Sequence, residues 1–190
     1  MKKKVTVIAV LVICLSLIAT GTLAYFTTDA IARNVITTGG VGVELVEKHI
    51  GEDGVEVDFP AEGIPGVMPG ASVSKIVSAK NTKAEAWIRI KVEKVATAAD
   101  GSALPTDLIT FKVDETKWLE KDGYFYYRQP VATGASTDIL FDEVYFDGAM
   151  GNEYQGSKIE IIVSAQAVQT ANNGTTVEEA AGWPEAPVVE

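Results

Sequence analysis

His49 is the single histidine in this 190-residue sequence. A zinc peptidase of the HExxH type needs two histidines one helical turn apart, and a Ser-His-Asp triad needs a histidine that activates a nucleophilic serine. The sequence supplies no second histidine and no GxSxG turn. We therefore interpret His49 as a surface residue at the end of a strand, and we expect neither a catalytic nor a metal site.

The 26 acidic residues contain no pair that stands out as the two carboxylates of a glycosidase. One stretch gathers several oxygen-bearing side chains, the ligands that calcium prefers on loops, but it lacks the spacing of an EF-hand. We expect ordinary turns and no cofactor here, with weak calcium binding as the alternative. The stretch contains Asp142, Glu143, Asp147, Asn152 and Glu153.

Aromatic residues gather at Trp87, Trp118 and the run 124–127. Such rings stack on sugars in some binding proteins, but they also fill the cores of β-sheets. We expect packing to be their use here. The formal net charge of −10 disfavours binding to nucleic acid, because phosphates repel an acidic surface.

The N-terminus has the pattern of an export signal. Lys2, Lys3 and Lys4 precede an apolar run over 5–18, and small residues at Thr22 and Ala24 end it. We expect a signal peptide over 1–24, cleaved between Ala24 and Tyr25. The alternative is an uncleaved anchor, since the run is nearly long enough to span a bilayer; it would be the chain's one association with a membrane.

Cleavage would remove three lysines, no acidic residue and the lone cysteine, Cys14. The charge would move from −10 to −13, and no disulfide would be available to the exported chain. We do not expect a lipid anchor at Cys14, because the residue before it, Ile13, is not small.

Beyond the signal, short alternating segments separated by Gly/Pro turns predict an all-β fold. We expect about eight strands and little helix in a jelly-roll-like two-sheet β-sandwich spanning 41–172, followed by a polar C-terminal tail over 173–190. The Pro/Gly-rich stretch 59–70 is expected to be a loop. The expected strands lie at 41–45, 55–57, 71–81, 84–95, 108–113, 137–146 and 158–168, with a hairpin over 118–127.

Two stretches of the sequence have a distinctive pattern. One is GTLAYFTTD at 21–29, followed by VGVEL at 41–45; the other is MPGASVSK at 68–75, followed by VSAKN at 77–81. Both resemble the TasA/camelysin family of secreted Gram-positive proteins. The resemblance implies a jelly roll, a signal peptidase of the SipW type, and extracellular fibres of a biofilm matrix. It also implies a link to the camelysin side of the family, which is metallopeptidase-like, although the residues present here give that activity no support.

Because we find no catalytic constellation, a structural role is our first hypothesis. The segment 25–40 is extended in character and would be freed by cleavage, so we expect it to add as a donor strand to the next copy, with a hinge at Gly39 and Gly40. Such a head-to-tail contact propagates as a homopolymer, and an accessory assembly protein is a further expected partner. The residues assigned to the subunit contact are Tyr25, Phe26, Ala30, Ile31, Val35 and Ile36.

Two other functions remain open. A monomeric secreted binding or adhesion module would use the same fold without self-assembly. A camelysin-like metallopeptidase would need a metal site that His49 cannot complete alone. All three place the protein outside the cell, in the matrix or at the cell surface.

Overall fold

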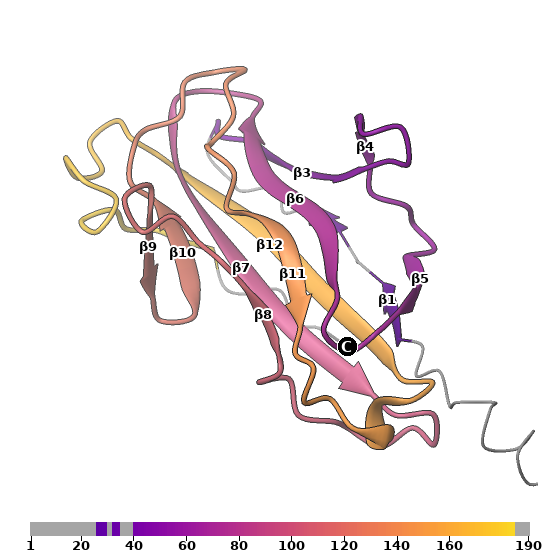
Figure 1. Cartoon of the computed structure of the whole chain (residues 1–190). Helices are drawn as coiled ribbons and strands as arrows, with labels where there is room; N and C mark the ends of the chain where they lie inside the picture. The colour runs from indigo at the N-terminus through magenta and orange to yellow at the C-terminus, as the bar shows by residue number, and fades with distance from the viewer. Residues whose placement is uncertain (1–25, 30–31, 35–39, 185–190) are drawn as a thin grey trace, which may run out of the picture.

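The computed structural model describes residues 26–29, 32–34 and 40–184, which form an all-β two-sheet sandwich (Figure 1). The predicted fold class is confirmed. Helix in the described residues is limited to one 3-10 turn, η1, at Asn152–Tyr154. The strands are β1 (Phe26–Asp29), β2 (Ala32–Asn34), β3 (Val43–Ile50), β4 (Glu56–Asp58), β5 (Ile64–Val67), β6 (Ser72–Asn81), β7 (Ala86–Thr97), β8 (Ile109–Phe111), β9 (Trp118–Lys121), β10 (Tyr124–Tyr127), β11 (Phe141–Phe146) and β12 (Lys158–Gln169).

The two sheets differ in size. The seven-stranded sheet has the order β5-β1-β12-β7-β10-β9, and β2 also pairs with β12. The five-stranded sheet has the order β4-β3-β6-β11-β8. Long strands occupy the centre of each sheet and short strands occupy the edges, so most of the core lies between β7 and β12 on one side and β3, β6 and β11 on the other (Figure 1).

The central pair of the larger sheet follows the predicted alternation. β7 and β12 pair antiparallel along their whole length, from Lys158 opposite Thr97 to Gln169 opposite Ala86. Alternate residues of both strands enter the core, as the period of two in their sequences predicts. The inward, buried residues of these two strands are Ala86, Ile88, Ile90, Ala96, Ile159, Ile161, Val163, Ala165 and Ala167.

Three strands are additional to the expected set. β1 and β2 lie in the segment predicted to be extended, and β5 lies in the stretch 59–70 that was predicted to be a loop. The loop prediction is therefore wrong at Ile64–Val67. Pro65 is compatible with a strand there because β5 is an edge strand that pairs with β1 alone, so the missing N–H disrupts little of the ladder.

The strand expected over 137–146 begins only at Phe141. The residues before it still run beside β6, where Thr137 donates its N–H to the Ala79 oxygen and accepts the Ala79 N–H on its hydroxyl. A side-chain oxygen thus replaces a backbone acceptor, and the ladder with β6 is further shifted between Phe141 and Glu143. Regular pairing between β11 and β6 begins at Glu143, after this irregular stretch.

Candidate assembly site at the edge of β12

The N-terminal strands lie beside β12 in their own domain. β1 pairs parallel with β12, with Thr27, Thr28 and Asp29 opposite Lys158, Ile159 and Glu160. β2 continues this parallel ladder, from Ala32 opposite Val163 to Asn34 opposite Ala165. Figure 1 shows β1 in indigo between β5 and the N-terminal end of β12.

β1 also pairs with β5 on its other side, where Phe26 lies opposite Val67 and Thr28 opposite Ile64. The short N-terminal strand therefore occupies a slot between two strands of the same sheet. Its backbone groups are paired in both directions, which is how an added strand completes a sheet.

The predicted assembly residues are only partly described. Phe26 lies in β1, whereas Ala24, Tyr25, Ala30, Ile31, Val35, Ile36 and Gly39 lie outside the described residues. Gly40 has a φ angle of +78°, with no atom within 4 Å of the position of an added Cβ. Glycine adopts such an angle readily, so the junction with β3 uses a conformation that other residues avoid.

β12 pairs with β7 along one edge and with β1 and β2 along the other, so it is a central strand only when the N-terminal strands are in place. Its first edge is fully paired with β7, and its inner face lies in the core. The other edges of both sheets consist of short strands: β4 and β8 have three residues each, and β5 and β9 have four. Short edges that carry charges or proline resist unwanted pairing with other chains. Without β1 and β2, the twelve-residue β12 would present a long exposed edge instead.

The Pro-Gly motif forms the turn that joins β5 to β6. Ala71 donates its N–H to the Met68 oxygen at 3.1 Å, and Gly70 has a φ angle of +79°. Proline followed by a residue of positive φ is the pattern of a type II turn. The Gly70 N–H also bonds to the Phe146 oxygen at 2.8 Å, which ties this turn to β11.

Asn81, the last residue of the second motif, is fully buried and holds two loops together. Its side-chain amide donates to the backbone oxygens of Ala84 and Val131 at 2.8 and 2.7 Å, and its Oδ1 accepts the Lys83 N–H. The sequence shows an asparagine at the end of a strand. It does not show the burial, because one of the bonded oxygens is fifty residues away.

The residues considered for catalysis or metal binding do not meet in a site. His49 pairs with Val57 in β4, and its ring lies edge-on to Phe59 at 5.8 Å between centroids. Asp147 accepts the Ala149 N–H on its carboxylate, as in an ordinary turn. The part of the chain that the structure describes contains no group of three or more His, Cys, Asp or Glu side chains that could hold a metal ion. The expectations that the chain is no enzyme and binds no cofactor stay predictions.

The aromatic residues serve packing, as predicted. Trp118 is buried in the main core and tilts against Tyr127 at 5.0 Å, while its indole N–H donates to the Ile139 oxygen. Trp87 is buried on the outer face of the larger sheet, in a second cluster with Tyr126. Neither tryptophan offers an exposed ring for a sugar.

The chain after residue 173, predicted to be a polar tail, packs against that outer face as far as residue 184. Val177 is buried in the second cluster, and Trp183 lies edge-on to Tyr126 at 5.5 Å. Arg89 anchors the same segment by donating to the Pro184 oxygen at 3.1 Å. Its guanidinium also bonds to Gln166 and stacks over Tyr124 at 3.8 Å. Val177 and Trp183, two apolar residues in a polar stretch, are the sequence signal of this packing.

A cleft of about 500 Å³ lies at the side of the sandwich away from β1. Lys94 crosses between the sheets there, donating from Nζ to the Ile109 oxygen at 2.8 Å. The cleft is lined by apolar and charged residues of β7 to β10 and the loops between them, among them Lys94, Phe111, Trp118, Phe125 and Arg128. Trp118 and Phe125 belong to the aromatic residues that were considered for sugar stacking and expected to pack in the core.

Comparison with known proteins found no family model that matches the chain, no curated protein similar to it and no solved structure that resembles it. The TasA/camelysin resemblance therefore rests on the two stretches quoted above. Among the described residues, no helix is long and apolar enough to span a membrane.

Proposed function

We propose that this chain is a secreted structural subunit that assembles into extracellular fibres by exchange of its N-terminal strands. The observation that supports the proposal is the placement of β1 and β2, which complete the larger sheet at the edge of β12. In a fibre, the same segment of a second copy would take this place, and the acceptor would be the slot between β5 and β12.

The N-terminal strands form the same backbone hydrogen bonds whether they pair with β12 of their own chain or with β12 of another copy. The difference in free energy between these two arrangements is therefore small compared with the free energy of the pairing. High local concentration of subunits then favours pairing between chains. Each copy carries one donor segment and one acceptor slot, which is a heterologous contact that does not close. The expected product is a filament rather than a ring.

The resemblance to the TasA/camelysin family supports the extracellular setting. Removal of residues 1–24 by a SipW-type peptidase would free the segment that starts at Tyr25. Before cleavage, the signal would hold that segment at the membrane and keep it from reaching another copy. Export and assembly would then be coupled in one step.

Thr28→Pro tests the role of β1, because Thr28 is in register with both β12 and β5. Proline removes an N–H and cannot be accommodated in the middle of a ladder. We expect the processed wild-type chain to form fibres in electron micrographs and the variant to elute as a monomer in size-exclusion chromatography.

The matched control is Thr28→Val, which keeps the N–H and has a high preference for strands. It should form fibres like the wild type. Fibres of normal amount and width from Thr28→Pro would contradict an assembly role for β1.

One observation favours a second candidate, a monomeric secreted binding module. The cleft beside Lys94 has the size of a small-ligand site and is lined by both apolar and charged residues. This candidate predicts a single monomeric species at all concentrations. It also predicts a saturable glycan signal that Lys94→Ala and Arg128→Ala remove.

A further inference from the structure

A lysine points into the core of the sandwich. β6 sends alternate residues inward, and Lys75 takes a place in this row between Val73 and Val77. The residue is fully buried, with a relative exposure of 0%. Lysine is almost never fully buried without a partner, because an isolated buried charge is strongly unfavourable.

The partner is Glu47 on the neighbouring strand. Glu47 lies opposite Val77 in the β3–β6 ladder, so Lys75 is its diagonal neighbour on the same face. Lys75 Nζ lies 2.5 Å from Glu47 Oε1, and the glutamate side chain is 7% exposed. Charge-assisted N–H···O bonds usually measure about 2.7–2.9 Å, so this contact is shorter than is usual for its class.

Phe59 covers the pair. Its ring centroid lies 4.1 Å from Lys75 Nζ, and its backbone N–H donates to the backbone carbonyl oxygen of Glu47 at 3.1 Å. The ring is thus fixed by the same strand that carries the carboxylate. The amine and the carboxylate are thus held in contact and are almost fully buried.

Burial lowers the pKa of the Lys75 amine, and the attraction of the Glu47 carboxylate opposes that effect only in part. A proton passed from the ammonium to the carboxylate would leave two neutral groups, an amine and a carboxylic acid. This form avoids the penalty of two desolvated charges. It also places a nucleophile beside an electrophile.

We propose that Lys75 and Glu47 are joined by an amide bond between Nζ and Cδ, a covalent staple between β6 and β3. The amine nitrogen attacks Cδ, the bond from Cδ to one carboxyl oxygen breaks, and that oxygen leaves as water with both protons. One proton comes from the acid and one from the amine, so the step balances without an oxidant or a reductant.

The contact between the amine and the carboxyl group favours formation of the amide bond. Two groups held in contact react with an effective concentration far above that of free groups in solution, up to about 10⁵–10⁸ M in favourable cases. A cleft of about 390 Å³, lined in part by Glu47, Asp58 and Phe59, gives the released water a way out. A staple of this kind suits a chain in which residues 25–190 contain no cysteine and can form no disulfide.

The test is the intact mass of the purified chain under denaturing conditions, after its N-terminus has been sequenced. We expect a mass lower than that calculated from the sequence by one water molecule. Proteolytic digestion should yield a branched peptide that joins the segment around residue 47 to the segment around residue 75.

Lys75→Arg is the matched control, because it keeps the positive charge and lacks the amine. Its mass should equal the calculated value. A wild-type chain with the full calculated mass would overturn the proposal, whether or not the variant folds. The outcome is independent of fibre formation, so the two proposals can fail separately.

Discussion

Asn81 shows how one buried polar side chain fixes the end of a sheet. Its amide and carbonyl groups satisfy three backbone groups from two loops. Buried polar groups that lose their partner cost about 1–3 kcal/mol each, so this residue is more than a strand terminator. The sequence identified the position, but the long-range partner at Val131 was not accessible from local pattern.

Asn81→Ala should therefore lower the free energy of unfolding by about 1–3 kcal/mol, since it removes the side-chain bonds to the Ala84 and Val131 oxygens, although the Val131 oxygen keeps the Ala86 N–H as a donor. Chemical denaturation followed by circular dichroism measures the change. Asn152→Ala, at an exposed position in η1, is the control and should change little. Equal effects from the two substitutions would contradict the structural role of Asn81.

Asp114 belongs to a different class of residue, an exposed carboxylate in a turn. Its pKa lies below the ordinary 3.8, first because the Thr116 hydroxyl donates to it and second because the Thr116 N–H does so too. A carboxylate with a lowered folded pKa stabilises the fold above its unfolded pKa. That contribution disappears as the pH falls through the lowered value.

Asp114→Asn should therefore destabilise the protein at neutral pH, and the difference from the wild type should shrink as the pH falls below about 4. Denaturation curves at several pH values measure it. Thr116→Val removes the donor hydroxyl and should reduce the same pH dependence. A constant difference between Asp114→Asn and the wild type across this range would contradict the assignment.

At the scale of the element, alternation predicted the long strands well. β7 and β12 have twelve residues each, and their apolar faces are unambiguous in the sequence. β5 was missed because four residues containing Pro65 and Gly66 carry no alternating signal. Its strand character comes from pairing with β1, which is a tertiary effect.

The C-terminal segment was missed for a related reason. Polar composition predicts a solvated tail, but Val177 and Trp183 are enough to anchor it over Trp87 and Tyr126. Arg89 contributes by bonding to the Pro184 oxygen from the centre of the sheet. A few well-placed contacts thus outweigh the average polarity of the segment.

Val177→Ala should loosen this segment, because truncating a buried apolar side chain costs about 2 kcal/mol. We expect the rate of proteolytic cleavage within 173–184 to rise about thirtyfold. Thr176→Ala, one residue away and exposed, is the control and should leave the rate unchanged. Cleavage at the wild-type rate in Val177→Ala would show that the segment is held by other contacts.

At the scale of the whole molecule, the sequence predicted the sandwich and the extended N-terminal segment, but not the acceptor. Pairing partners far apart in a chain leave no local trace, so only the structure relates residues 26–34 to β12. The outer strands of both sheets are short and offer little edge for pairing with another chain. β12 is long, and its second edge is exposed only when the N-terminal segment does not cover it.

Strand exchange between copies is the central claim, and cysteine cross-linking tests it directly. Residues 25–190 contain no cysteine, so one can be introduced into each of two chains without interference. Thr27 and Lys158 are register partners in the parallel β1–β12 ladder. Neighbouring strands place such partners within the Cα separation that a disulfide spans.

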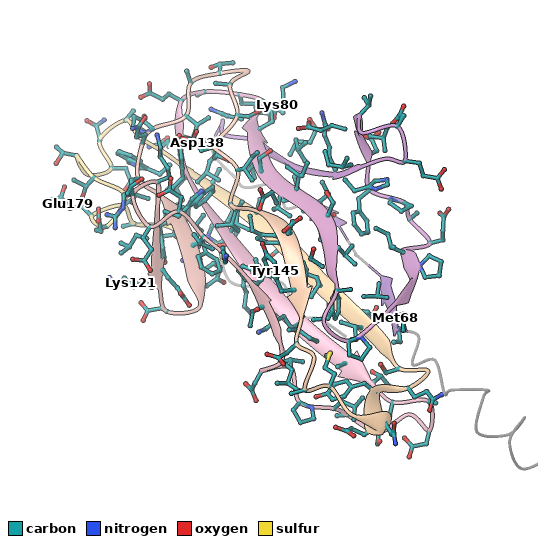
Figure 2. All side chains as sticks on the ribbon, viewed as in Figure 1. Met68, Lys80, Lys121, Asp138, Tyr145 and Glu179 are labelled. Atoms are coloured by element: carbon teal, nitrogen blue, oxygen red, sulfur yellow. The ribbon has the colours of Figure 1, made fainter. Side chains whose placement is uncertain are left out.

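The measurement mixes a Thr27→Cys chain with a Lys158→Cys chain under assembly conditions, followed by oxidation and non-reducing electrophoresis. The control pairs Thr27→Cys with Lys121→Cys, which lies in β9 at the opposite edge of the sheet (Figure 2). Strand exchange predicts a disulfide-linked heterodimer from the first mixture and none from the second. Fibres that form without that heterodimer would contradict the claim.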